Sequence, residues 1–208
     1  MKLFFQTIVL LFCQNLFCQE YFFDNFLEYK EQNGRINFHL TNSSNSSYHL
    51  NSSYGSETIY GKIRDTESNI FHEYEVVNEN NNIKFNYLFS RKYNPENHKT
   101  HLSYKITERK IDSINTEFKI IVFKNKKRKK IDFKIEIIVE NSNDLFCYEL
   151  LTFYTHTIFL KSDFKIEKGF ISKIKVEREN GSNNEYNLIK KQKISTLLKI
   201  SKEQIQYR

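Results

Sequence analysis

The chain has 208 residues, of which 39% are hydrophobic and 27% charged, and it carries a net charge of +7 at neutral pH. These values are typical of a soluble globular protein with one domain, and they exclude a collagen, a disulfide-dense miniprotein and a multi-span membrane protein. With one Pro, 5 Gly, 19 Phe and 13 Tyr, the composition also excludes a low-complexity disordered chain.

The first residues are typical of a secretory signal peptide. Lys2 supplies a positive charge, and the segment Leu3–Phe12 that follows is almost entirely apolar. Such a run fits a signal core and is shorter than the roughly 20 residues of a membrane span. We therefore predict a signal peptide over residues 1–18, export to the periplasm or the outside of the cell, and a mature chain that starts at Gln19 and has no transmembrane span. A bulky Phe precedes each of the two cysteines in this segment, which argues against a lipoprotein.

Most of the remaining chain alternates between apolar and polar residues with a period of two. This period is that of half-buried strands, and turn-forming Asn and Ser clusters separate the alternating segments. Strands are expected over residues 36–40, 47–50, 58–64, 70–77, 83–89, 102–107, 117–123, 131–139, 170–176 and 185–190. In the last but one, the alternation places Phe170, Ser172, Ile174 and Val176 on one face.

Three segments fit more than one structure. Tyr21–Gln32 fits either a helix or an edge strand. Asp144–Phe153 fits a helix with Asp144 as its N-cap, and Ser195–Ile205 fits a short amphipathic C-terminal helix. The fold predicted over residues 19–208 is therefore a single mainly β domain. Its architecture is an antiparallel curved sheet, a sandwich or an open barrel, with one or two short helices.

The strongest local charge feature is a basic run between the strands expected over 117–123 and 131–139. Its cations are Lys124, Lys126, Lys127, Arg128, Lys129 and Lys130. The simplest interpretation is a solvated hairpin tip. Clustered Lys and Arg also attract anionic surfaces, so this run is the candidate binding site for phospholipid headgroups or polysaccharide. It contains no aromatic residue for base stacking, which argues against nucleic acid.

Other constellations give weaker signals. His39 and His49 are spaced to meet across a hairpin, but two ligands do not make a metal site, and no metal or other cofactor is predicted. Cys147 and His156 are the residue types of a nucleophile and its base, whereas the surroundings of Cys147 in sequence resemble a core segment. No phosphate-binding loop, dinucleotide fingerprint or serine-nucleophile motif occurs.

These features favour an exported, non-enzymatic protein associated with the cell envelope, which binds an envelope component or an apolar ligand. The aromatic residues are numerous enough to line the concave face of a curved sheet, and such a face suits an apolar small molecule. One alternative is a structural module that docks on another envelope protein through an edge strand. A second alternative is a hydrolase that uses an unidentified acid pair or the Cys147 and His156 pair.

Overall fold

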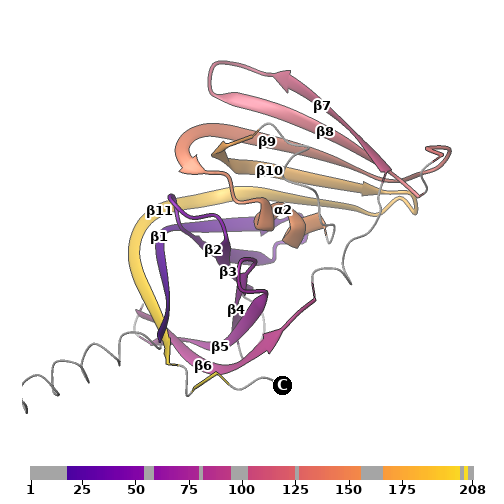
Figure 1. Cartoon of the computed structure of the whole chain (residues 1–208). Helices are drawn as coiled ribbons and strands as arrows, with labels where there is room; N and C mark the ends of the chain where they lie inside the picture. Colours follow the sequence, from indigo (N-terminus) through magenta and orange to yellow (C-terminus); the bar gives the residue numbers. More distant parts are fainter. Residues whose placement is uncertain are drawn as a thin grey trace, which may run out of the picture.

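The computed structural model describes residues 18–53, 59–79, 82–94, 103–124, 127–155, 166–201 and 204–205. These residues form one antiparallel sheet of 11 strands and a short helix, α2 (Tyr148–Thr155) (Figure 1). The strands are β1 (Cys18–Glu31), β2 (Ile36–Thr41), β3 (Tyr48–Ser53), β4 (Ile59–Asp65), β5 (Ile70–Glu79), β6 (Asn82–Lys92), β7 (Ser103–Lys110), β8 (Asn115–Phe123), β9 (Ile131–Leu145), β10 (Lys168–Arg178) and β11 (Asn183–Ser201). The predicted mainly β, open curved architecture is confirmed.

Two meanders, β1–β6 and β7–β11, share this sheet, and the pairing of β1 with β11 joins them at its centre. The strand order is β6-β5-β4-β3-β2-β1-β11-β10-β9-β8-β7, with antiparallel neighbours throughout. In the described part of the chain, β6 and β7 are therefore the sheet edges, and they run in the same direction. Figure 1 shows the first meander curling below the β1–β11 pair and the second lying above it, with α2 between them.

The sheet carries a hydrophobic core on each of its faces. Adjacent residues of a strand point to opposite faces, and on β1 the neighbours Phe26 and Leu27 belong to different clusters. The helix-side core contains Leu27 and Tyr29 and collects the buried side chains of α2 and of β8–β10. The N-terminal core contains Phe26 and is built mainly from β1–β5. The fold therefore has two packed layers that share the central strands, rather than one enclosed interior.

Bulges in the long strands correct some of the predicted faces. The register of β10 against β9 shifts between Ile171 and Lys173. A bulge adds one residue to a strand and so reverses the faces of the residues beyond it. As a result Ile171, rather than Phe170, is buried, while Ile174 and Val176 are buried as predicted. The register of β1 against β11 shifts in the same way between Phe23 and Asn25.

Two of the segments with ambiguous patterns form strands of the central pair, β1 and β11. Tyr21–Gln32 forms most of β1, which is a central strand rather than a helix or an edge, since it pairs with both β2 and β11. The helix expected over Ser195–Ile205 is wrong, because β11 continues to Ser201 and pairs with β1 along nearly its whole length. Burial alternates there with a period of two.

Helix α2 begins later than the sequence suggested. Asp144 still belongs to β9, and its carboxylate accepts hydrogen bonds from Lys191 and Lys193 at 2.9 and 3.1 Å instead of capping the helix. Leu151 is buried as expected. No helix in the described part of the chain has the length and apolarity needed to cross a membrane.

Candidate functional site

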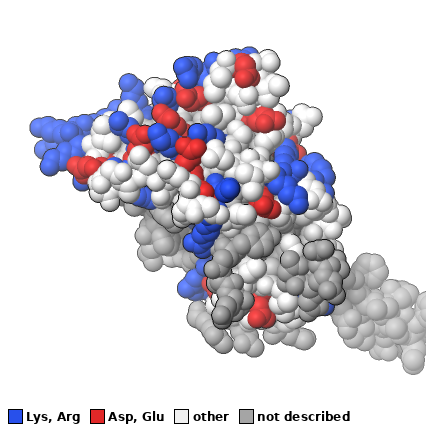
Figure 2. Space-filling model, turned by 180° about the vertical axis from the view of Figure 1, so that it is seen from behind, with Lys and Arg blue, Asp and Glu red and all other residues white. Residues whose placement is uncertain are grey.

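The basic run forms the hairpin tip between β8 and β9, as the sequence indicated. The Lys124 amide donates to the Lys130 carbonyl at 3.0 Å, which closes the base of the tip. Arg128 adopts a positive φ of 54°, and its Nε donates to Ser103 Oγ at the start of β7, 2.9 Å away. The described cations of the tip are all exposed: Lys124, Lys127, Arg128, Lys129 and Lys130. Lys126 lies outside the described residues. Figure 2 shows Lys and Arg side chains gathered at this projecting end of the molecule.

Acidic side chains lie beside the base of the tip. Glu179, in the turn between β10 and β11, forms an ion pair with Lys124. That contact raises the pKa of Lys124 and lowers the pKa of Glu179. Among the described residues, no ion pair involves the four cations from Lys127 to Lys130. Lys130 also contributes to the lowered pKa of Glu179, and Asp132 to the raised pKa of Lys124. The five described cations of the tip therefore outnumber these two carboxylates, and the end of the hairpin keeps a net positive charge.

The cations of the sheet face are arranged differently. Lys119 lies 3.1 Å from Glu136 across β8 and β9, and Lys173 lies 2.9 Å from Glu185. Lys175 lies 2.6 Å from Glu177, two residues along the same strand. Each of these cations has an opposite charge beside it, so its field is largely cancelled at a distance. The tip differs from these paired cations because its positive charges are contiguous and exceed the nearby negative charges, so they produce a local field that an anionic partner can detect.

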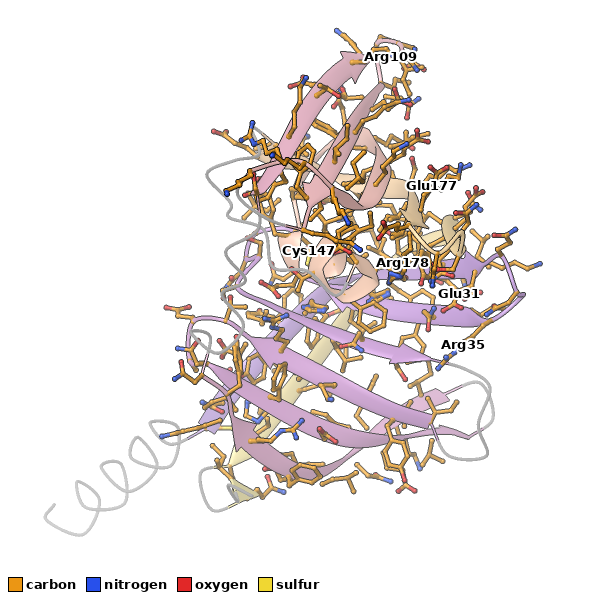
Figure 3. The ribbon with its side chains drawn as sticks, turned by 90° about the vertical axis from the view of Figure 1, so that its right-hand side faces the viewer. Glu31, Arg35, Arg109, Cys147, Glu177 and Arg178 are labelled. Carbon is orange, nitrogen blue, oxygen red and sulfur yellow. The ribbon has the colours of Figure 1, made fainter. Side chains whose placement is uncertain are left out.

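A crevice near Cys147 is the second candidate site. Figure 3 places Cys147 where the two halves of the sheet meet. The crevice is lined by Asn25, Cys147, Phe170 and Lys191, among others. The Lys191 ammonium lies 3.6 Å from the centroid of the Phe170 ring. The crevice offers about 20 Å³, enough for a water molecule but not for an acyl chain. It therefore lends no support to the apolar-ligand hypothesis, which remains a prediction.

Of the two residues proposed for catalysis, the structure describes Cys147 but not His156. Cys147 is half-buried against the helix-side core, consistent with a packing role. His156 lies outside the described residues, so the Cys147 and His156 hypothesis also remains a prediction. Within the part of the chain that the structure describes, no group of three or more His, Cys, Asp or Glu side chains is placed to hold a metal ion.

A hydrogen-bonded chain in the N-terminal core was not anticipated from the sequence. Tyr21 Oη donates to Asp65 Oδ2 at 2.9 Å and lies 2.8 Å from His72 Nε2. His72 Nδ1 lies 2.6 Å from Ser90 Oγ. Because the Tyr21 proton is committed to Asp65, His72 carries its proton on Nε2 and accepts from the Ser90 hydroxyl on Nδ1. Burial lowers the pKa of His72 to about 4, so the imidazole is neutral at pH 7.

This order of groups resembles a catalytic relay, but its position does not suit one. Ser90 and His72 are each 0% exposed, and a nucleophile must reach its substrate. The chain links β1, β4, β5 and β6, and we interpret it as a polar crosslink that satisfies buried groups. The alternation of Ile70, His72 and Tyr74 in the sequence predicted the inward direction of the imidazole but could not identify its partners.

Comparisons of the chain with protein-family models, with curated proteins and with solved structures found no match. The choice between the candidate sites therefore depends on their geometry and charge.

Proposed function

We propose that this protein is an exported, non-enzymatic component of the cell envelope that binds anionic phospholipid headgroups through the β8–β9 tip. The observation that carries the proposal is the group of four exposed cations, Lys127 to Lys130, none of which forms an ion pair within the described part of the chain. The signal-like start of the sequence supports export, because it would bring the tip to a membrane surface.

The charge of the tip sets the expected strength of binding. A Lys or Arg close to an anionic membrane surface contributes about 1 kcal/mol. Four such cations give about 4 kcal/mol, which corresponds to roughly a 1,000-fold enrichment at the surface. Binding of this kind is reversible, and it weakens as salt shortens the Debye length. Each cation that is removed should reduce the affinity about fivefold.

Vesicle binding tests the lipid assignment. The mature chain is titrated with phosphatidylcholine vesicles that contain or lack phosphatidylglycerol, at low and at high salt. We expect binding only to the anionic vesicles, with loss of affinity at high salt. Absence of binding would overturn the proposal, and so would binding to an anionic polysaccharide in the absence of any binding to vesicles.

A matched pair of variants separates the tip from net charge. In the first variant, Lys127, Arg128, Lys129 and Lys130 are all replaced by Gln. In the control, four exposed lysines elsewhere are replaced by Gln: Lys30, Lys110, Lys168 and Lys190. Both variants lose four charges. The tip variant should lose nearly all binding and the control much less, whereas equal losses would show that only the overall charge matters.

Export has its own test. The full chain is expressed in a host with a secretion pathway, and the denatured mass of the product is measured. A mass that corresponds to a chain starting at Gln19 would support export, whereas retention of residues 1–18 would contradict it.

A further inference from the structure

Helix α2 covers two buried histidines on the helix-side face of the sheet. His39 on β2 is 0% exposed and His49 on β3 is 1% exposed. Their rings are stacked, with centroids 6.4 Å apart and planes at 29°. His39 Nε2 lies 2.7 Å from the hydroxyl of Tyr154, in the last turn of the helix. The sequence therefore located this pair correctly across the β2–β3 hairpin, and it indicated a helix near α2, but it did not show that the helix packs over the pair.

The two imidazoles are poorly satisfied in their buried site. Among the described residues, His39 Nδ1 and both ring nitrogens of His49 have no hydrogen-bond partner. His49 also lies directly opposite Arg64 in the register of β3 and β4. Burial, followed by the charge of the Arg64 guanidinium, lowers the pKa of His49 to about 3. Burial, followed by the proximity of His49, lowers the pKa of His39 well below its ordinary value.

The first turn of α2 is attached to the same cluster. Glu149 lies 2.9 Å from Arg64, whose guanidinium also lies 5.3 Å from the Tyr93 ring and 5.7 Å from the Phe71 ring. The helix is therefore tied to the sheet at both ends, by Glu149 at its start and by Tyr154 at its end. It has only eight residues, and a helix of that length is not stable in water without such attachments.

The charges around the pair are unbalanced when the histidines are protonated. Within the described ranges, the charged groups that face the pair are Arg64 from β4 and Glu149 from α2. Tyr29 from β1 and Tyr154 from α2 also contact His39, but both phenols are neutral because burial raises their pKa. At neutral pH the cluster holds one cation and one anion. With both histidines protonated it would hold three cations and one anion.

We propose that the His39–His49 pair is an acid-operated latch, whose protonation beside Arg64 releases helix α2 from the sheet. Release of α2 lets water reach the imidazolium ions. It breaks only the contacts of one short helix and leaves the hydrogen bonds between the strands intact. The open state is favoured by proton uptake. Each histidine that regains an ordinary pKa of about 6.5 there increases opening about 30-fold between pH 7.5 and pH 5. This inference is independent of the lipid-binding proposal.

Hydrogen exchange of the full mature chain tests the latch. Exchange of peptides from α2 and from β9 is measured at about pH 7.5 and about pH 5 and corrected for the intrinsic pH dependence of amide exchange. We expect exchange in α2 to accelerate at least 30-fold at the lower pH while β9 remains much more strongly protected than α2. Unchanged exchange in α2 would overturn the proposal. Equal corrected exchange rates in α2 and β9 at the lower pH would also overturn it, because the helix would then open only by global unfolding.

Variants make the assignment specific. His39→Gln combined with His49→Gln should remove the acid-dependent opening, whereas His72→Gln, which removes a buried histidine of the opposite core, should leave it in place. If the double variant does not fold, Glu149→Gln serves instead. It removes the carboxylate that pairs with Arg64 and should move the opening to higher pH, and an unchanged midpoint would contradict the latch.

Discussion

Gly169, near the start of β10, is the position where a single added methyl group should be most damaging. Its φ is +126°, and a Cβ built there would lie 2.8 Å from the carbonyl oxygen of Glu140 and 2.9 Å from Val139 Cγ1. The backbone strain of an L-residue at such a φ costs about 1–2 kcal/mol. Overpacking against a strand that cannot move without breaking its ladder adds about 1–3 kcal/mol. We therefore expect Gly169→Ala to lower the free energy of unfolding by about 2–5 kcal/mol.

The matched control is Gly181→Ala in the turn between β10 and β11. Gly181 has a φ of +80°, but a Cβ there would have no atom within 4 Å. That variant should suffer only the strain of about 1–2 kcal/mol. Urea unfolding followed by circular dichroism gives both values, and the denaturant slope should stay unchanged. If both variants lose the same stability, overpacking of a Cβ at Gly169 against β9 does not destabilise the protein, and the reasoning is refuted.

Three further predictions concern stability. The pKa values of His39, His49 and His72 are all depressed in the folded state, so their contribution is complete above pH 6.5 and is lost as the pH falls. Between pH 7 and pH 5.5 the free energy of unfolding should fall by about 1.3 kcal/mol for each histidine, about 4 kcal/mol for the three, and a flat urea midpoint over that range would contradict this. Tyr21→Phe removes the hydroxyl between Asp65 and a buried imidazole and should cost about 1–3 kcal/mol in urea unfolding; unchanged stability would mean that the polar crosslink is not stabilising. Ile137→Ala, at a fully buried position of β9, should cost about 2–5 kcal/mol by the same assay, and a loss below about 1 kcal/mol would refute its place in the core.

The sequence predicted the fold where burial follows a simple period. On β5, and on β9 from Ile135 to Val139, the alternation named the buried residues correctly, because each of these stretches has one face in a core. At the start of β9 the prediction was wrong, since Ile131 is 40% exposed. Prediction failed on β1, whose residues enter cores on both faces, so that apolar side chains occur at consecutive positions such as Phe26 and Leu27. It also failed at the β10 bulge, where one extra residue changes the face and leaves no clear mark in the sequence.

The candidate sites were predictable to different degrees. The basic tip was visible because its residues are contiguous in the chain, and the position of His39 and His49 could be inferred from a single hairpin. The contacts of Arg64 with Glu149 and of Tyr154 with His39 could not be inferred. They bring together residues that are far apart in the chain, and they depend on where α2 lands on the sheet, which local patterns do not encode.

The most direct test of the lipid-binding proposal is to map where the protein meets a membrane. Hydrogen exchange of the mature chain is measured with and without phosphatidylglycerol-containing vesicles, at neutral pH, where the α2 latch is closed. We predict slower exchange in peptides that cover the β8–β9 tip and unchanged exchange in β2–β5. Slowing that is confined to another surface, or no slowing at all under conditions where the protein sediments with the vesicles, would contradict the proposal that the basic tip is the binding site.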